Sequence, residues 1–254
     1  TIAVTLPFLV VFVQLKRTRR RVLLALLGAT IVTLCVLYSK SRGGQLVMIS
    51  VGGVYFVHRF KLRGLVLSLA AGAALFVVIV GARGDEAAQS SAERIAHMHE
   101  GMLMFKYSPV LGVGAEQYTE HHYMTAHNAY VLTVAETGGV GMFFWVAILY
   151  LSMKIPLIAY LRYRRRPEHA ELRYWSVALI AALVGTYLGI FFLSFTWHYM
   201  LWCYLALSGA FYRAIKLHDD GFKVSFRFFD FAAVSVLTVG LIGGLFVLTT
   251  LLNR

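Results

Sequence analysis

The sequence predicts an all-α, polytopic integral membrane protein: a helical bundle of about eight transmembrane spans, with one large loop outside the membrane. Hydrophobic residues make up 59% of the 254 residues and charged residues only 14%, and the mean hydropathy is +0.70. A soluble core would not need this much apolar surface. Backbone polar groups in hydrocarbon must pair within their own segment, so the spans are expected to be helices.

Apolar windows that can cross a bilayer about 30 Å thick recur along the chain. The chain opens on an apolar run whose basic residues follow it, the reverse of a secretory signal peptide. We therefore expect a fragment that lacks amino-terminal helices. Three parts follow: transmembrane helices at 1–81, an outward loop at 82–128 and transmembrane helices at 129–254. The windows lie at about 1–15, 22–39, 44–57, 64–81, 129–159, 173–193, 196–212 and 228–250.

The positions of Lys and Arg predict the orientation in the membrane. Basic runs at 16–21, 58–63, 162–166 and 213–227 fall in every second connection, and such residues accumulate on the cytoplasmic side. The long loop therefore faces the periplasm if the chain lies in a bacterial inner membrane. The net charge of +12 is spread over loops beside hydrophobic spans, which indicates topology and attraction to membrane lipids. No nucleic acid partner is predicted.

Polar residues are concentrated in the loop. Six of the twelve acids and five of the nine histidines lie between Arg83 and His127. Ionisable groups are costly in hydrocarbon, so this segment is the candidate periplasmic catalytic loop. Ser90 and Ser91 ahead of Glu93 predict a short helix over about 91–106, which Pro109 should follow.

Four motifs occur in order along the chain: SRGG at 41–44, ER at 93–94, SPVLGVG at 108–114 and AHNAYVLTVAETGGVG at 126–141. This set resembles the O-antigen ligase family of membrane glycosyltransferases, over about 22–212 and most closely over 108–141. The resemblance implies a GT-C-like helical fold and a glycan donor linked to undecaprenyl diphosphate. It also implies metal-independent, cofactor-free transfer to an acceptor hydroxyl on the periplasmic side. The IAHMHEG segment after Arg94 departs from the family, because relatives commonly have a tryptophan there.

The resemblance assigns Arg42 and Arg94 to the donor diphosphate and His127 to the role of catalytic base. Guanidinium groups bind phosphate oxygens bidentately and keep their charge, so two of them can replace a metal ion. An imidazole with a pKa near 6.5 is suited to accept a proton at neutral pH. Asn128 would orient donor or acceptor.

Each assignment has a structural alternative. Arg42 would extend from the membrane toward headgroups, Arg94 would be a solvated helix residue, and His127 would cap a helix. Glu136 lies nine residues after His127 and therefore on the opposite helix face, which favours packing over direct catalysis.

The glycines in the motifs also have possible structural roles. Gly112 and Gly114 permit a close backbone approach to a ligand or a neighbouring helix. The glycines at 138, 139 and 141 are expected to allow a kink or close helix packing. A metal site built from histidines 97, 99, 121, 122 and 127 is not favoured, because 97 and 99 diverge on a helix and no HExxH spacing is present.

The function predicted from these observations is glycan transfer from undecaprenyl diphosphate to an acceptor hydroxyl, with lipid A core as the first choice of acceptor. O-antigen or exopolysaccharide polymerisation and protein O-glycan ligation use the same motifs. A polyprenyl-glycan transporter or a non-catalytic assembly subunit is the alternative of another class. The sequence does not specify the sugar, the acceptor or the oligomeric state.

Overall fold

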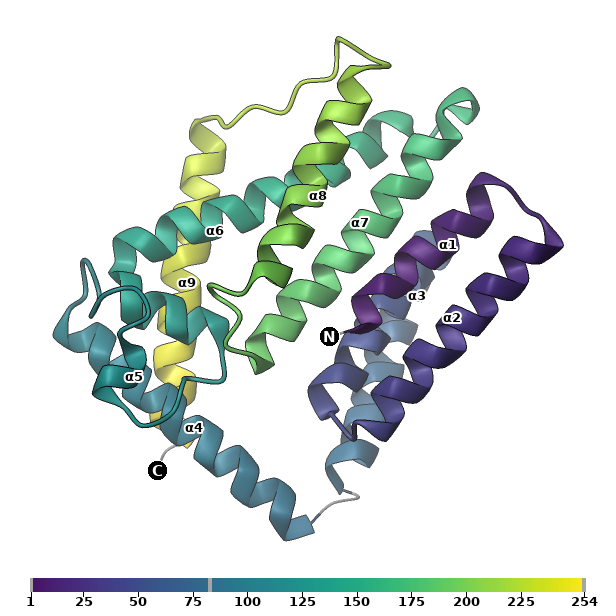
Figure 1. Ribbon diagram of the computed structural model, residues 1–254. Helices are drawn as coiled ribbons and strands as arrows, with labels where there is room; N and C mark the ends of the chain where they lie inside the picture. Colours follow the sequence, from purple (N-terminus) through teal and green to yellow (C-terminus); the bar gives the residue numbers. More distant parts are fainter. Residues whose placement is uncertain (1, 82–83, 253–254) are drawn as a thin grey trace. The chain divides into compact units, whose positions relative to one another are not determined.

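The computed structural model describes residues 2–81 and 84–252, all regular structure of which is helical (Figure 1). The first two residues of the predicted loop, 82 and 83, lie outside the described residues. The expected all-α class is confirmed over this range. The α-helices are α1 (Leu6–Leu15), α2 (Arg19–Tyr38), α3 (Arg42–Gly81), α4 (Gly84–Tyr107), α5 (Tyr118–His121), α6 (Ala129–Tyr163), α7 (Ala170–Gly189), α8 (Tyr199–Lys216) and α9 (Phe228–Leu252).

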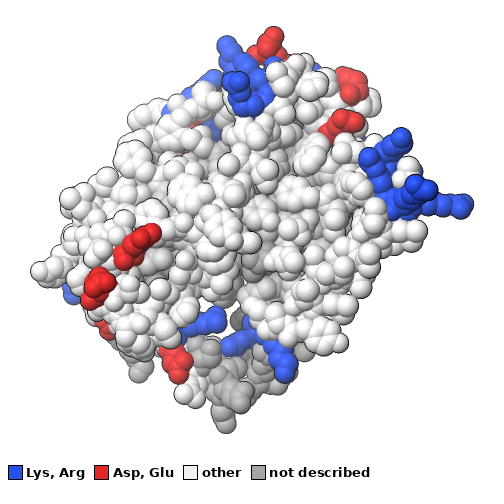
Figure 2. Space-filling model, in the orientation of Figure 1, with Lys and Arg blue, Asp and Glu red and all other residues white. Residues whose placement is uncertain are grey.

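Four helical segments of the described chain are long and apolar enough to cross a membrane. They are Arg19–Tyr38, Ala129–Tyr163, Pro167–Phe192 and Phe228–Leu252, and each overlaps a predicted span. Many leucines of α2 are exposed, among them Leu23 and Leu26, as expected for a helix that faces lipid. Figure 2 shows a broad uncharged area with Lys and Arg gathered at a few places. The chain is therefore a multi-pass membrane protein, and the total of eight spans stays a prediction.

Helix α3 is a helical hairpin, because Lys61 has non-helical angles (φ 52°, ψ −129°) in its middle. The Ser68 hydroxyl donates a hydrogen bond to the carbonyl of Gly53, fifteen residues earlier, at 3.5 Å. A straight helix would separate these residues by about 22 Å, at about 1.5 Å per residue. The chain therefore turns back within the basic run 58–63. This turn separates the predicted spans 44–57 and 64–81.

The chain divides into two compact units. The first unit comprises residues 1–79, 152–189 and 203–224, and the second comprises 80–151, 190–202 and 225–254. In the first unit, Val4, Val47 and Val51 share a buried apolar core, and Gly185 of α7 approaches Val51 closely. In the second unit, α4 packs along α9. The second unit holds the predicted catalytic loop.

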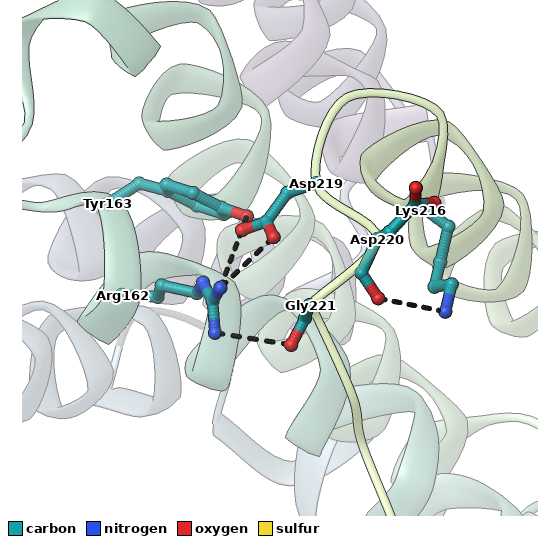
Figure 3. A network of polar contacts seen from close by, with 6 residues as sticks. All are labelled: Arg162, Tyr163, Lys216, Asp219, Asp220 and Gly221. Atoms are coloured by element: carbon teal, nitrogen blue, oxygen red, sulfur yellow. Dashed lines mark hydrogen bonds and ion pairs between the residues drawn. The ribbon is translucent and has the colours of Figure 1, made fainter.

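A polar network in the first unit fastens the end of α6 to the turn after α8 (Figure 3). Arg162 forms an ion pair with Asp219 (Nη2 to Oδ2, 2.7 Å), and the Tyr163 hydroxyl donates to the same carboxylate at 2.7 Å. The hydrogen bonds from Tyr163 and Arg162 lower the pKa of Asp219. Lys216 donates to the backbone carbonyl of Asp220. These contacts give the turn at 218–223 a structural role.

Candidate functional site

The SPVLGVG segment (108–114) is bound to a kink in α6. Gly138 has φ 65° and ψ −168°, which breaks the helical hydrogen-bond ladder. The amides of Val113 and Gly114 donate to the freed carbonyls of Ala135 and Glu136 at 2.9 and 3.0 Å. In return, the amides of residues 139 and 140 donate to carbonyls 109 and 110 at 2.8 and 3.3 Å. The loop therefore satisfies backbone groups that the kink leaves unpaired.

Two glycines make this contact sterically feasible. A Cβ on Gly112, whose φ is +72°, would lie 2.3 Å from the carbonyl carbon of Glu136. A Cβ on Gly138 would lie 2.3 Å from the carbonyl oxygen of Val110. The predicted kink is confirmed at Gly138. The close approach expected for Gly112 is to another helix, and Gly114 (φ +111°) continues the same turn.

Replacing Gly138 by Ala is expected to destabilise the protein by roughly 2–4 kcal/mol, because the new Cβ meets backbone and the residue has positive φ. Thermal unfolding in detergent measures the loss. Gly209→Ala in α8 is the matched control, since nothing lies within 4 Å of the added Cβ. An unchanged melting temperature for Gly138→Ala would contradict the steric account.

Asn128 caps the first turn of α6. Its Oδ1 accepts hydrogen bonds from the amides of Tyr130 and Val131 at 2.9 and 3.1 Å. The side chain is buried, and its Nδ2 has no hydrogen-bond partner among the described residues. Asn128 therefore has a structural role as a helix cap, and its Nδ2 group can still donate hydrogen bonds.

His127 directly precedes this cap and has a left-handed backbone, with φ 51°. The side chain is half-buried. Its ring centroid lies 5.8 Å from that of His97 on α4. His97 is buried, and its Nδ1 is hydrogen-bonded to Nε2 of His122 at 2.9 Å. Three histidines from α4 and the following loop are therefore grouped in the second unit.

Burial and the nearby Arg94 guanidinium lower the pKa of His127 below its usual 6.5. Burial also lowers the pKa of His97, with further contributions from His122 and His127, while Glu93 opposes them. Both imidazoles are therefore mainly neutral at pH 7. A neutral imidazole can accept a proton, which is the state a general base needs.

The two predicted cations lie in different units. Arg94 is exposed on α4, one turn before His97, in the same unit as His127. Arg42 is half-buried at the start of α3 and belongs to the first unit. Arg94 and His127 thus form one electrostatic group, to which Arg42 is not assigned.

Glu136 is buried, and both of its carboxylate oxygens are hydrogen-bonded. The amide of Tyr118 donates to Oε1 at 3.2 Å, and Nε1 of Trp197 donates to Oε2 at 2.6 Å. The Tyr118 hydroxyl donates in turn to the backbone carbonyl of His97. Glu136 therefore supports the histidine group through Tyr118. Tyr118 and Trp197 were not predicted as site residues, because no spacing in the sequence links them to Glu136.

Replacing Glu136 by Ala should destabilise the protein by about 2–4 kcal/mol, because it leaves the buried Tyr118 amide without its acceptor and frees the Trp197 N–H. Chemical or thermal unfolding in detergent measures this. Trp197→Phe removes only one donor and should cost less. The double variant should lose less than the sum of the two single losses; strict additivity would show that the Trp197 contact contributes nothing.

Among the residues that the structure describes, no group of three or more His, Cys, Asp or Glu is arranged to hold a metal ion. His97 contacts the rings of both His122 and His127 and shares one hydrogen bond with His122. His99 and His121 make none of these ring contacts within the described chain.

Comparison with known proteins gives one match. Residues 27–146 match the family model described as O-antigen ligase. No curated protein and no solved structure matched the chain. The matched range contains every predicted site residue, namely Arg42, Arg94, Gly112, Gly114, His127, Asn128 and Glu136. The resemblance found in the four motifs is therefore confirmed.

Proposed function

Residues 27–146 match the family model described as O-antigen ligase, and from this premise we propose that the chain belongs to that family and transfers a glycan from undecaprenyl diphosphate to an acceptor hydroxyl. Lipid A core is the proposed acceptor, and the reaction takes place at the periplasmic face of the inner membrane. Members of this family are ligase-like or polymerase-like membrane glycosyltransferases. The donor, the acceptor and the roles of individual residues are our proposal.

The observation that carries the proposal is the electrostatic group formed by Arg94 and His127. His127 is half-buried with a lowered pKa, so it is unprotonated when a substrate arrives. Arg94 keeps its positive charge beside it. A base and a permanent cation close together are the two groups that transfer from a diphosphate to a hydroxyl requires.

The proposed reaction is a single displacement at the anomeric carbon. The acceptor oxygen forms a bond to this carbon as the bond from the carbon to the diphosphate oxygen breaks. The acceptor proton moves to His127, and the bond electrons leave with undecaprenyl diphosphate. Arg94 stabilises the negative charge of the leaving group, and the donor-binding role expected for Arg42 stays a prediction. One displacement inverts the anomeric configuration.

After each transfer His127 must release its proton. His97 lies beside it, and the hydrogen bond from His97 to His122 leads toward the loop, where His122 is only half-buried. We assign His97 and His122 as positioning residues that also give this proton an outlet. Asn128 contributes its unpaired Nδ2 to the acceptor or donor, and Glu136 acts through Tyr118 rather than on substrate.

An acceptor panel tests the proposal. The purified chain in liposomes is given undecaprenyl-diphosphate oligosaccharide together with lipid A core, with a second donor glycan or with an acceptor protein, and products are separated by mass. Coupling to lipid A core is the expected result. Coupling only to glycan or to protein would replace ligation by polymerisation or protein glycosylation. Absence of every product would overturn the enzymatic proposal in favour of a transporter or an assembly subunit.

A further inference from the structure

A polar cavity lies in the first unit, and none of the residues of the proposed catalytic group lines it. It has a volume of about 180 Å³ and is formed by α1, the first arm of α3, the end of α6 and α7. Every residue that lines it belongs to the first unit. The lining residues are Gln14, Tyr55, His58, Tyr160, Arg164, Arg173, Tyr174 and Val177.

The charge of this lining is entirely positive. Two guanidinium groups, Arg164 and Arg173, face the cavity, and none of the described residues that line it is acidic. Within the described chain, no ion pair joins either arginine to a carboxylate. The neighbouring Glu171 lines a different, mainly apolar cavity. The positive charge of the cavity is thus available to a ligand.

The remaining side chains supply hydrogen-bonding groups, and one of them packs against Arg173. The Arg173 guanidinium lies over the Tyr174 ring, 5.4 Å from its centroid. His58 Nδ1 and the Tyr160 hydroxyl are hydrogen-bonded at 3.2 Å. Burial and Arg173 lower the pKa of His58, so this imidazole is neutral at pH 7 and the arginines carry the charge.

We propose that this cavity binds a phosphate group, supplied either by the headgroup of an anionic phospholipid or by free inorganic phosphate. Paired guanidinium groups match phosphate oxygens, and tyrosine hydroxyls provide additional donors. The volume is below the roughly 300–1,000 Å³ of sites for drug-sized ligands and above the about 30 Å³ of one water molecule. The cavity suits a small anionic group rather than a glycan.

The predicted topology favours a lipid headgroup as the source. The cavity lies beside the basic runs 58–63 and 162–166, which the distribution of Lys and Arg assigns to the cytoplasmic side. Basic pockets between transmembrane helices on this side are suited to anionic headgroups. The inference does not depend on glycan transfer, because it concerns different residues and the opposite predicted side of the membrane.

The test measures lipid binding to the purified full chain by native mass spectrometry in detergent, with phosphatidylglycerol and phosphatidylcholine as probes. Inorganic phosphate is tested separately by its effect on the melting temperature. The variant Arg164→Gln with Arg173→Gln removes the two cations of the cavity. Arg165→Gln with Arg166→Gln removes the same charge from two exposed neighbours that do not line it.

We expect the unmodified chain and the control to retain phosphatidylglycerol at least tenfold better than phosphatidylcholine, and the cavity variant to lose this preference. Stabilisation by inorganic phosphate in the unmodified chain, without a lipid preference, would identify free phosphate as the source. The proposal would be overturned if both double variants lost the phosphatidylglycerol preference equally. It would also be overturned if the unmodified chain showed neither a lipid preference nor stabilisation by inorganic phosphate. Arg164→Glu alone changes an exposed side chain, and it gives the same test if the double variant fails to fold.

Discussion

Replacing His127 by Asn is expected to lower kcat for glycan transfer by roughly 100- to 10,000-fold, the contribution typical of a general base. Asn tolerates the left-handed backbone that His127 adopts, so the variant should keep its fold. It cannot accept a proton near neutral pH. Initial rates in liposomes with saturating donor and acceptor measure the effect, and the melting temperature verifies folding.

The matched control is His121→Asn. His121 belongs to the same loop, but it is exposed and makes none of the ring contacts of the described histidine group. Its replacement should leave kcat unchanged. If the His127 variant retained full activity while folded, the role of base would be wrong, and a structural role in helix capping would remain.

Replacing Arg94 by Ala should lower kcat/KM by roughly 10- to 100-fold, because one charge-assisted contact to the diphosphate is worth about 1.5–3 kcal/mol. A second effect concerns pH. The Arg94 charge disfavours the imidazolium form of His127, so its removal raises the pKa of His127. The acid limb of the pH profile of kcat/KM lies below pH 6.5 in the unmodified chain and should move to higher pH in Arg94→Ala.

Arg94→Lys separates the two effects, because it keeps the charge but loses bidentate binding. Its acid limb should stay in place while kcat/KM falls. The imidazole of His97 also lies beside His127, and Glu93 raises the pKa of His97 against the effect of burial. Repeating the pH profile of kcat/KM in His97→Gln therefore shows whether the acid limb reports His127 or His97. A limb that stays fixed in Arg94→Ala would show that the protonation that limits the rate is not that of His127.

Much of the fold was predictable because long apolar runs leave few alternatives. The predicted spans at 22–39, 129–159 and 228–250 agree with α2, α6 and α9 within a few residues at most ends. The predicted helix at about 91–106 corresponds to the second part of α4, which begins earlier at Gly84. The glycines of α6 predicted its kink. In the structure the kink lies at Gly138, where a Cβ would collide with the carbonyl of Val110.

The contacts between distant residues were not predictable. His97 and His122 are 25 residues apart, and only the path of the loop brings them into a hydrogen bond. Glu136 and Trp197 are joined across 61 residues for the same reason. Helical periodicity does not relate Glu136 to His127, because His127 precedes α6 and has a left-handed backbone. It also gives no information on which loop meets the face that carries Glu136. The concentration of five of the nine histidines between Arg83 and His127 was the sign of the group in the sequence.

The phosphate cavity was also hidden in the sequence. Its arginines belong to basic runs whose first interpretation is membrane orientation, and exposed arginines are usually solvated. The arginines at 164 and 173 differ from their basic neighbours at 165 and 166 because the folded chain places them in the lining of this cavity. Residue type alone does not separate such a site from a topological signal.

The most direct test of the account follows bond formation and lipid movement in the same proteoliposomes with EDTA present. The donor is fluorescent undecaprenyl-diphosphate oligosaccharide, and lipid A core is supplied on the side that the periplasmic loop faces. We expect a new glycosidic product in EDTA, with an inverted anomeric configuration. Movement of the donor across the bilayer without product, or transfer that stops in EDTA and returns with Mg²⁺, would contradict it.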